Sequence, residues 1–292
     1  MVDSMSSGVI LAHLGGTETE TSVLNTALAL ARPIDGHIDA LFVRPDPSKS
    51  THAFEEGFYA GSYAPLVKAI EQQWTDLSKN IFERFEKWRA TKQLHARYEP
   101  NGGNPSVEWR EIIGDEREVI KHAGQLADVI VMAHRTGQAQ SQGEPLFETA
   151  LLGTGRPIVL APPHAHGDLA LEKILVAWNS SPEAARAVGA ALPLLSKATE
   201  VFVFSAREGK LSGRSAEELV EYLSWHGVRA SVFSSRNDTN SVPEAVLAAA
   251  KRSRADLLVM GAYTHSRLRE LAFGGVTRHV LSHAALSVFM SH

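Results

Sequence analysis

The residues best suited to chemistry in this chain lie in one segment, 261–277. The segment reads Gly-Ala-Tyr-Thr-His-Ser-Arg-Leu-Arg-Glu-Leu-Ala-Phe-Gly-Gly-Val-Thr, and it joins an apolar run at 255–260 to a stretch with helical spacing. A glycine at a strand end and a glycine pair at a helix start allow backbone N–H groups to approach an anion closely. This arrangement predicts a loop that binds phosphate.

The spacing of these glycines resembles the signature of the universal stress protein family. That signature has a glycine, two residues, a second glycine, nine residues, and then a third glycine followed by Ser or Thr. Gly261 and Gly274 fall on the first and third glycines, whereas Thr264 replaces the second glycine and Gly275 replaces the hydroxyl residue. The resemblance implies an adenine-nucleotide-binding fold of five parallel strands that serves in stress adaptation.

Carried onto this sequence, the resemblance implies nucleotide contacts from three places in the second half of the chain. One group ends the first strand of that half, a second group ends the next strand and borders the base, and the glycine segment holds the phosphates. The ligand it implies is ATP or another adenine nucleotide, which Mg²⁺ can accompany. In chain order, the implied residues are Ala177, Trp178, Asn179, Phe204, Ser205, Met260, Gly261, Tyr263, Thr264, Gly274, Gly275, Val276 and Thr277.

Three of these positions depart from the family pattern. Family members that bind nucleotide usually carry an acid where Asn179 stands, but an asparagine still accepts and donates hydrogen bonds. If Thr264 must adopt a positive φ, a β-branched residue there costs about 1–2 kcal/mol. Gly275 lacks a hydroxyl donor but keeps its backbone N–H, and Thr277 can supply a hydroxyl nearby.

The chain repeats its own pattern, which predicts a tandem duplication. Residues 9–16 resemble 174–181, and residues 126–133 resemble 254–261. Each pair places an apolar strand at the same point of a half. We therefore expect a first domain at 1–163, a linker at 164–172 and a second domain at 173–292.

Each half alternates short apolar runs with helical periods, which is typical of a parallel sheet covered by helices on both faces. The expected fold class is α/β: two tandem five-stranded parallel open sheets, Rossmann-like and, as the resemblance implies, adenine-nucleotide alpha-hydrolase-like. In such sheets, ligands bind beyond the carboxyl ends of the strands, where the strand order reverses. In the second half, we expect strands at 173–178, 199–205, 228–234, 255–260 and 286–291, and helices at 182–197, 213–226, 241–253 and 274–284.

The first half lacks the features of a nucleotide site. No glycine pair opens its last helix, and Glu144 and Pro145 fall at or beside the places that the second half gives to its glycine pair. An acid there repels phosphate and a proline removes a donor, so we expect this half not to bind nucleotide. It also carries an aromatic-rich insertion at 44–64, followed by a helix at about 65–90.

Each half ends in an apolar strand, at 157–161 and at 287–291. Exposed apolar sheet edges invite pairing, and in the family such terminal strands commonly pair between protomers. Because this chain carries both copies, their local concentration is roughly millimolar, which favours pairing within the chain. We therefore expect the single chain to form a compact unit with pseudo-twofold symmetry. Further association into a homodimer is compatible with this unit but is not required.

Composition narrows the classes of function. The 292 residues carry a net charge of −4 and include no cysteine, which excludes disulfides and thiolate metal sites. That charge gives no reason to expect nucleic acid or a membrane as a partner. The N-terminus lacks the parts of a signal peptide and no apolar run is long enough to span a bilayer, so a cytoplasmic location is expected.

Other residues that could bind a metal or an anion, or act in catalysis, are weaker candidates. His279 and His283 have metal-ligand spacing, but Val280 stands where zinc peptidases need a glutamate, so an ordinary surface pair is the preferred interpretation. His134 and Arg135 end a strand of the first half and form a weak candidate anion site. No pair of carboxylates indicates catalysis.

Three hypotheses follow from these patterns. The leading one is a stress-response binding module that is not an enzyme, with any nucleotide held in the second half. The alternative is a family member that has lost nucleotide binding and acts through protein association or another small ligand. The third, a slow ATPase, has the least support because no general base or Mg²⁺-binding carboxylate is identifiable near 261–277.

Overall fold

The computed structural model describes residues 8–15, 19–46, 64–96, 105–134, 138–163, 169–206, 213–234, 241–263 and 275–292. Residues 264–274 of the glycine segment, which include Thr264 and Gly274, lie outside these ranges, as do residues 47–63 of the expected insertion. None of the helices within these ranges combines the length and the apolar character that crossing a membrane requires.

The first half alternates strands and helices in the order that its periodicity predicts. The helix expected at about 65–90 is α3, a single helix of 28 residues. The elements of this half are β1 (Val9–Leu14), α1 (Glu20–Ala31), a 3₁₀ turn (Arg32–Ile34), β2 (His37–Arg44), α3 (Ala64–Thr91), β3 (Ser106–Ile113), α4 (Glu116–Gly124), β4 (Val129–Ala133), α5 (Gln138–Gly153) and β5 (Ile158–Ala161).

The second half confirms each expected strand and helix, with ends that shift by at most three residues. The largest shift is at α7, whose first turn is preceded by a capping box between Ser215 and Glu218. The elements are β6 (Lys173–Ala177), α6 (Pro182–Leu195), β7 (Glu200–Phe204), α7 (Ala216–Trp225), β8 (Ala230–Val232), α8 (Val242–Arg252), β9 (Leu257–Gly261), α9 (Gly275–His283) and β10 (Ser287–Ser291).

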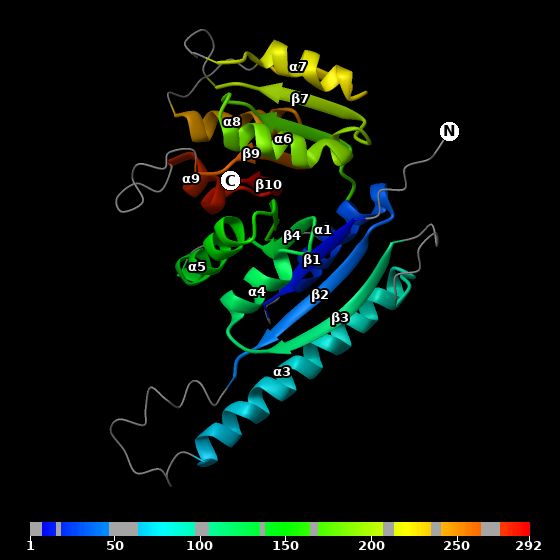
Figure 1. The fold of residues 1–292 in the computed structure, drawn as a ribbon, viewed down its shortest axis with the longest axis vertical. Coiled ribbons are helices and arrows are strands. Elements are labelled where there is room, and N and C mark those ends of the chain that lie inside the picture. The colour runs from blue at the N-terminus through cyan, green and yellow to red at the C-terminus, as the bar shows by residue number, and fades with distance from the viewer. Residues whose placement is uncertain are drawn as a thin grey trace.

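The strands of both halves form one sheet rather than two separate ones (Figure 1). Its order is β3-β2-β1-β4-β5-β10-β9-β6-β7-β8, so each half has the same internal order and all of its strands are parallel. The halves meet where β5 and β10 pair in antiparallel fashion, with Val288 opposite Leu160. The expected pairing of the two terminal strands within the chain is therefore confirmed.

Alternation along the strands divides the core between the two faces of this sheet. Val259 belongs to the core cluster that includes residues of α1, α3, α6 and α7 on one face, and its neighbour Leu258 belongs to the cluster that includes residues of α4, α5, α8 and α9 on the other. Successive side chains of a strand point to opposite faces, and a parallel sheet covered on both faces needs apolar residues at both. This explains why the strand sequences are nearly continuous apolar runs.

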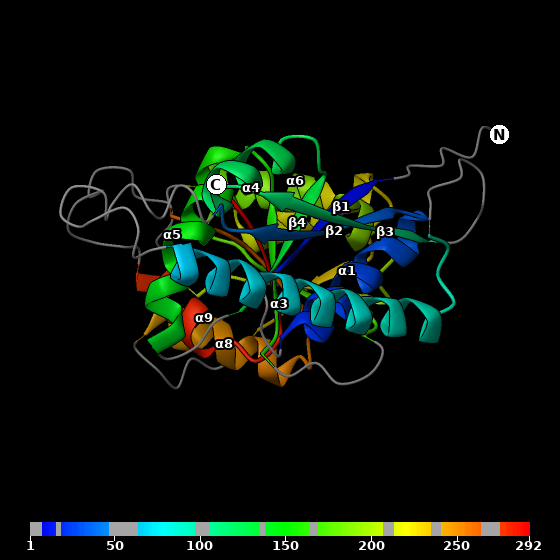
Figure 2. The same cartoon turned by 90° about the horizontal axis from the view of Figure 1, so that it is seen from below.

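The long helix α3 lies on the same face of the sheet as α1 and runs beside β2 and β3 (Figure 2). Trp88 Nε1 donates to Asn25 Oδ1 at 2.9 Å, and Arg84 pairs with Glu20 at 2.6 Å. The residues of α1 from Ser22 to Ala31 are all buried, and this helix contacts β1, β2, β4 and β5 of the sheet as well as α3. A helix that is apolar around most of its circumference requires such burial.

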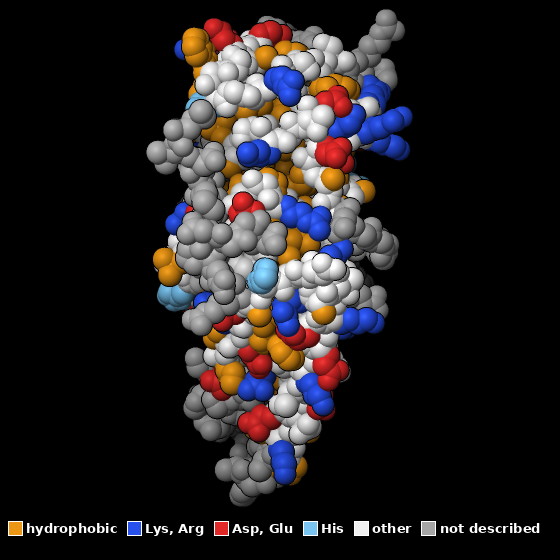
Figure 3. Space-filling view, turned by 90° about the vertical axis from the view of Figure 1, so that its right-hand side faces the viewer, with side chains coloured by type: hydrophobic (Ala, Val, Ile, Leu, Met, Phe, Trp, Pro, Cys, Tyr) orange, Lys and Arg blue, Asp and Glu red, His pale blue; other side chains and the backbone are white. Residues whose placement is uncertain are grey.

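The molecular surface mixes charges of both signs. On the face shown in Figure 3, acidic and basic side chains are interspersed with small groups of apolar ones. This face therefore presents no extended field of a single sign, the feature by which a protein attracts a polyanion such as nucleic acid.

Candidate functional site

The candidate site lies at the carboxyl ends of β6 and β9, which are adjacent in the sheet. Ala177 at the end of β6 is in register with Met260 of β9. From β6 the chain continues to β7 on one side, whereas it reaches β9 on the other side only after β8 and α8. This is the point at which the strand order reverses, where open α/β sheets form their ligand crevice.

The turn after β6 is held by its own polar groups. Asn179 Oδ1 accepts from the N–H of Ser181 at 3.2 Å, and Ser181 Oγ caps α6 by accepting from the N–H of Ala184 at 3.1 Å. Between them, Ser180 adopts a positive φ of 59°. Short polar side chains that bond their local backbone stabilise such turns. Asn179 remains exposed at the edge of the crevice, with its amide N–H group outside this turn.

Gly261 is required by packing. A Cβ at this position would lie 2.5 Å from Ala184 N and 2.8 Å from Glu183 C, which are backbone atoms at the start of α6. Absence of a side chain thus allows the end of β9 to lie directly against α6. The predicted importance of this glycine has a structural cause that does not depend on a ligand.

The two ends of the glycine segment are close together. The N–H of Tyr263 donates to Thr277 Oγ1 at 3.3 Å, and Tyr263 adopts a positive φ of 55°. Thr277 is buried, Val276 is half-buried and Gly275 is exposed at the N-terminus of α9. A Cβ added to Gly275 would have no neighbour within 4 Å among the described atoms, so none of these atoms fills the space beside Gly275.

Three of the expected contact residues are used mainly in packing. Phe204 and Met260 are buried in the core, on the face covered by α8 and α9. Trp178 lies on the opposite face of the sheet, with α6 and α7, and its Nε1 donates to the backbone oxygen of Arg214 at 2.8 Å. Ser205, at the end of β7, is half-buried. At the crevice, Asn179 is exposed, and Ser205, Tyr263 and Val276 are half-buried.

The corresponding edge of the first half is occupied by protein. Leu14, which takes the place of Asn179 in the repeat, is fully buried. His134 takes the place of Ala262 and is also buried, with Nε2 hydrogen-bonded to the backbone oxygen of Leu281 in α9. Burial lowers the pKa of His134, an effect that this hydrogen bond opposes, so the imidazole is neutral near pH 7.

The segment before β5 also differs between the halves. In the second half α9 begins at Gly275, whereas in the first half α5 begins at Gln138 and runs through Glu144 and Pro145. These two residues therefore lie inside a helix and not at its start, where the sequence comparison places them. At these two positions the first half is already helical, whereas the second half begins a helix at Gly275.

Comparison with known proteins identifies the second half. Residues 170–292 match the model of the Universal stress protein family. The second half of the chain is therefore similar to this family. A search of curated proteins gives no match to the chain.

Solved structures extend the likeness in fold to both halves. A universal stress protein from Archaeoglobus fulgidus is 17% identical, with a TM-score of 0.65 over 98% of this chain and 96% of that one. A functionally unknown protein from Pseudomonas aeruginosa is 15% identical, with a TM-score of 0.56 over 98% of this chain and 92% of that one. Both confirm the α/β fold of the chain.

Sequence reasoning missed one residue at the crevice of the second half. Glu183, in the first turn of α6, contacts Gly261 and has a side chain that is 13% exposed. Its Oε1 pairs with Arg186 at 3.0 Å, whereas its buried Oε2 has no hydrogen-bond partner within the described part of the chain. The sequence shows this glutamate only as a favourable helix-start residue, because its position beside β9 depends on the close packing at Gly261.

Proposed function

We propose that this chain is a universal stress protein, a stress-response module that binds one adenine nucleotide in its second half. The observation that carries the proposal is the meeting of three features at one edge of the sheet. These are the exposed Asn179 after β6, the strained Tyr263 after β9, and the open N-terminus of α9 at Gly275. Their proximity supports a crevice for a ligand with a polar and an anionic end.

The phosphate end of the ligand would lie at the N-terminus of α9. The first N–H groups of a helix have no partner within it, and the helix dipole favours negative charge there. Gly275 adds no side chain that would hold an anion away. Thr277 anchors this helix start to Tyr263, which keeps the N–H groups in position.

The sugar and base would lie toward β6 and β7. Asn179 offers its amide N–H group, and the unpartnered Oε2 of Glu183 offers an acceptor for a ribose hydroxyl. Ser205 borders the place where the base would lie. Glu183 would thus supply the carboxylate that the family resemblance expects at position 179. When Mg²⁺ accompanies the nucleotide, its role would be to neutralise phosphate charge.

The proposal restricts binding to one half of the chain. In the first half, Leu14 replaces the polar residue at the strand end and His134 is engaged with α9. An apolar side chain offers no hydrogen bond to a sugar. We therefore propose one nucleotide per chain.

Calorimetric titration of ATP into the full chain, with and without Mg²⁺, tests this proposal. The expected result is one site, lost in Gly275→Asp because a fixed carboxylate would take the place of the phosphate. That variant should still fold, since the site has room for a side chain and an acid is favourable at a helix start. Ser241→Asp adds the same charge at the start of α8 and is the matched control.

Two results would overturn the assignment. One is a stoichiometry of two nucleotides per chain, which would mean that the first half also binds. The other is an affinity that Gly275→Asp leaves equal to that of Ser241→Asp, which would mean that α9 does not hold the phosphates.

A further inference from the structure

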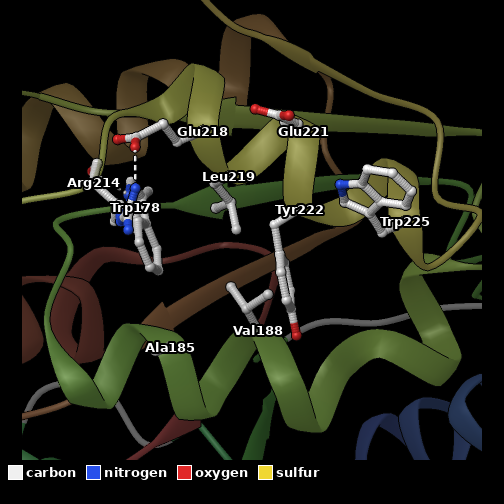
Figure 4. A pocket seen from close by; sticks show the side chains of 9 residues that line it. All are labelled: Trp178, Ala185, Val188, Arg214, Glu218, Leu219, Glu221, Tyr222 and Trp225. Carbon is white, nitrogen blue, oxygen red and sulfur yellow. Dashed lines mark hydrogen bonds and ion pairs between the residues drawn. The ribbon is translucent and has the colours of Figure 1, made fainter.

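A cavity of about 550 Å³ lies between α6 and α7, outside the crevice described above. Figure 4 shows α6 below it and α7 above it, with the Tyr222 side chain pointing from α7 toward Val188 on α6. Trp178 lies at one end of this α6–α7 cavity and Trp225 at the other. It is lined by Trp178, Ala185, Val188, Arg214, Glu218, Leu219, Glu221, Tyr222 and Trp225.

In the first half, the equivalent position is the contact between α1 and α3. Both α3 and α7 end with a residue of positive φ, Gln93 at 54° and Gly227 at 72°. After these residues, the N–H of Leu94 donates to the backbone oxygen of Arg89, and the N–H of Val228 donates to that of Leu223. Aligning these two helix ends places Tyr222 at the position of Trp88, and Leu219 at the position of Phe85.

In the first half, aromatic rings fill the space between α1 and α3. Phe85 is 1% exposed and Trp88 is 7% exposed, and the Trp88 indole donates to Asn25 on α1. In the second half the matching residues are smaller, and Tyr222 is 45% exposed. The cavity is thus the space that an indole and a phenyl ring occupy in the other copy of the same fold. A close-packed interior rarely leaves such a volume empty.

The walls of the α6–α7 cavity select for a particular chemistry. Aromatic faces of Trp178, Tyr222 and Trp225 suit a flat ring and attract positive charge. Arg214 and Glu218 form an ion pair of 2.5 Å and offset each other. Glu221 adds a further carboxylate at the rim, so the rim is negative overall. The volume lies within the range of small-molecule sites.

We propose that the α6–α7 cavity binds a small aromatic ammonium compound. Its ring packs between Val188, Leu219 and Tyr222, in the space that Trp88 and Phe85 fill in the first half. Its ammonium group lies at the rim, toward Glu221. This site is separate from the proposed nucleotide site, since of the residues that border the latter only Trp178 lines it.

Three probes that share an indole ring and differ in charge test the proposal: tryptamine, indole and indole-3-acetate. Titration calorimetry on the full chain should give the order tryptamine, then indole, then indole-3-acetate, from tightest to weakest. Glu221→Gln should weaken tryptamine by about threefold, the size of an exposed ion pair, and leave indole unchanged.

A filling variant with a matched control locates the site. Ala185 is an exposed residue of α6 that faces the cavity, so Ala185→Phe should fill it without disturbing the core and should abolish binding of all three probes. Ala190→Phe adds the same ring to an exposed position of α6 that does not line the cavity, and binding should persist. Gly275→Asp should leave tryptamine binding intact, which separates this site from the nucleotide site.

The proposal is overturned by any of three results: no binding of tryptamine at millimolar concentration, equal binding by the Ala185→Phe and Ala190→Phe variants, or tighter binding of indole-3-acetate than of tryptamine. The first would mean that the cavity has no affinity for the ring. The second would place binding elsewhere, and the third would mean that Glu221 does not determine the charge preference.

Discussion

Phe289 of β10 lies directly opposite Val159 of β5, and both side chains are buried at the join between the two halves. Their strands are antiparallel, whereas the strands within each half are parallel. A single sheet therefore continues through the molecule, and neither terminal strand is left as an open apolar edge. Duplication within one chain achieves here what association of two separate chains would otherwise provide.

A charge placed at this join should weaken the whole molecule. Val159→Lys buries an ammonium group with no partner and should lower the free energy of unfolding by roughly 3–5 kcal/mol. Val9→Lys is the control, because Val9 is 37% exposed at the start of β1 and a surface substitution changes stability by only about 0.5 kcal/mol. Urea unfolding measures both, and similar midpoints would show that the join contributes little.

The two glycines that border the crevice should respond differently to an added methyl group. Gly261→Ala forces a Cβ against the backbone of α6 and should destabilise by about 1–3 kcal/mol. Gly275→Ala meets open space and should be neutral or stabilising by about 0.4–1 kcal/mol. Thermal and urea unfolding of the two variants provide the comparison. Equal effects would contradict the packing role assigned to Gly261.

Much of this fold was predictable because short sequence patterns indicate where its helices and strands begin and end. The Ser181-Pro182-Glu183 start of α6 and the apolar runs of the strands are read directly from the sequence. The duplication further allowed the β5–β10 pairing to be expected. Local patterns do not reveal which way Trp178 turns or what Gly261 touches, because both depend on the approach of α6 and α7 after folding.

The α6–α7 cavity was not predictable for a related reason. A void arises from the sizes of side chains on two helices that are separated in sequence, here Ala185 and Val188 against Leu219 and Tyr222. Periodicity identifies each apolar face but not the fit between the faces. The cavity becomes evident when α7 is aligned with α3 by their C-terminal ends. In that alignment Tyr222 takes the position of Trp88, whose ring fills the corresponding space in the first half.

Stability should fall as the pH drops below about 6.5, the ordinary pKa of a histidine. Burial lowers the pKa of His134, and it also lowers that of His37. Between the lowered and the ordinary pKa, the unfolded chain binds a proton that the folded chain does not, so protons favour unfolding. Each histidine contributes a slope of at most about 1.4 kcal/mol per pH unit.

His134→Gln separates the contribution of His134 from that of His37. Glutamine does not titrate, and its amide can still donate to the backbone oxygen of Leu281. The slope of unfolding free energy against pH between 5 and 6.5 should therefore decrease without vanishing, since His37 remains. An unchanged slope in urea titrations over this range would mean that His134 is not the buried neutral group described above.

Glu183 should contribute to binding of the sugar rather than of the phosphates. Titration with adenosine isolates this contribution, because adenosine has the ribose hydroxyls but no phosphate. Glu183→Gln keeps the size of the side chain but replaces a carboxylate acceptor by a neutral amide, so adenosine affinity should fall by about 1 kcal/mol, or roughly fivefold. Glu244→Gln makes the same change in the first turn of α8, where the residue is exposed, and should leave adenosine binding unchanged. If both variants bind adenosine as the parent does, the free oxygen of Glu183 serves the packing of α6 and not the ligand.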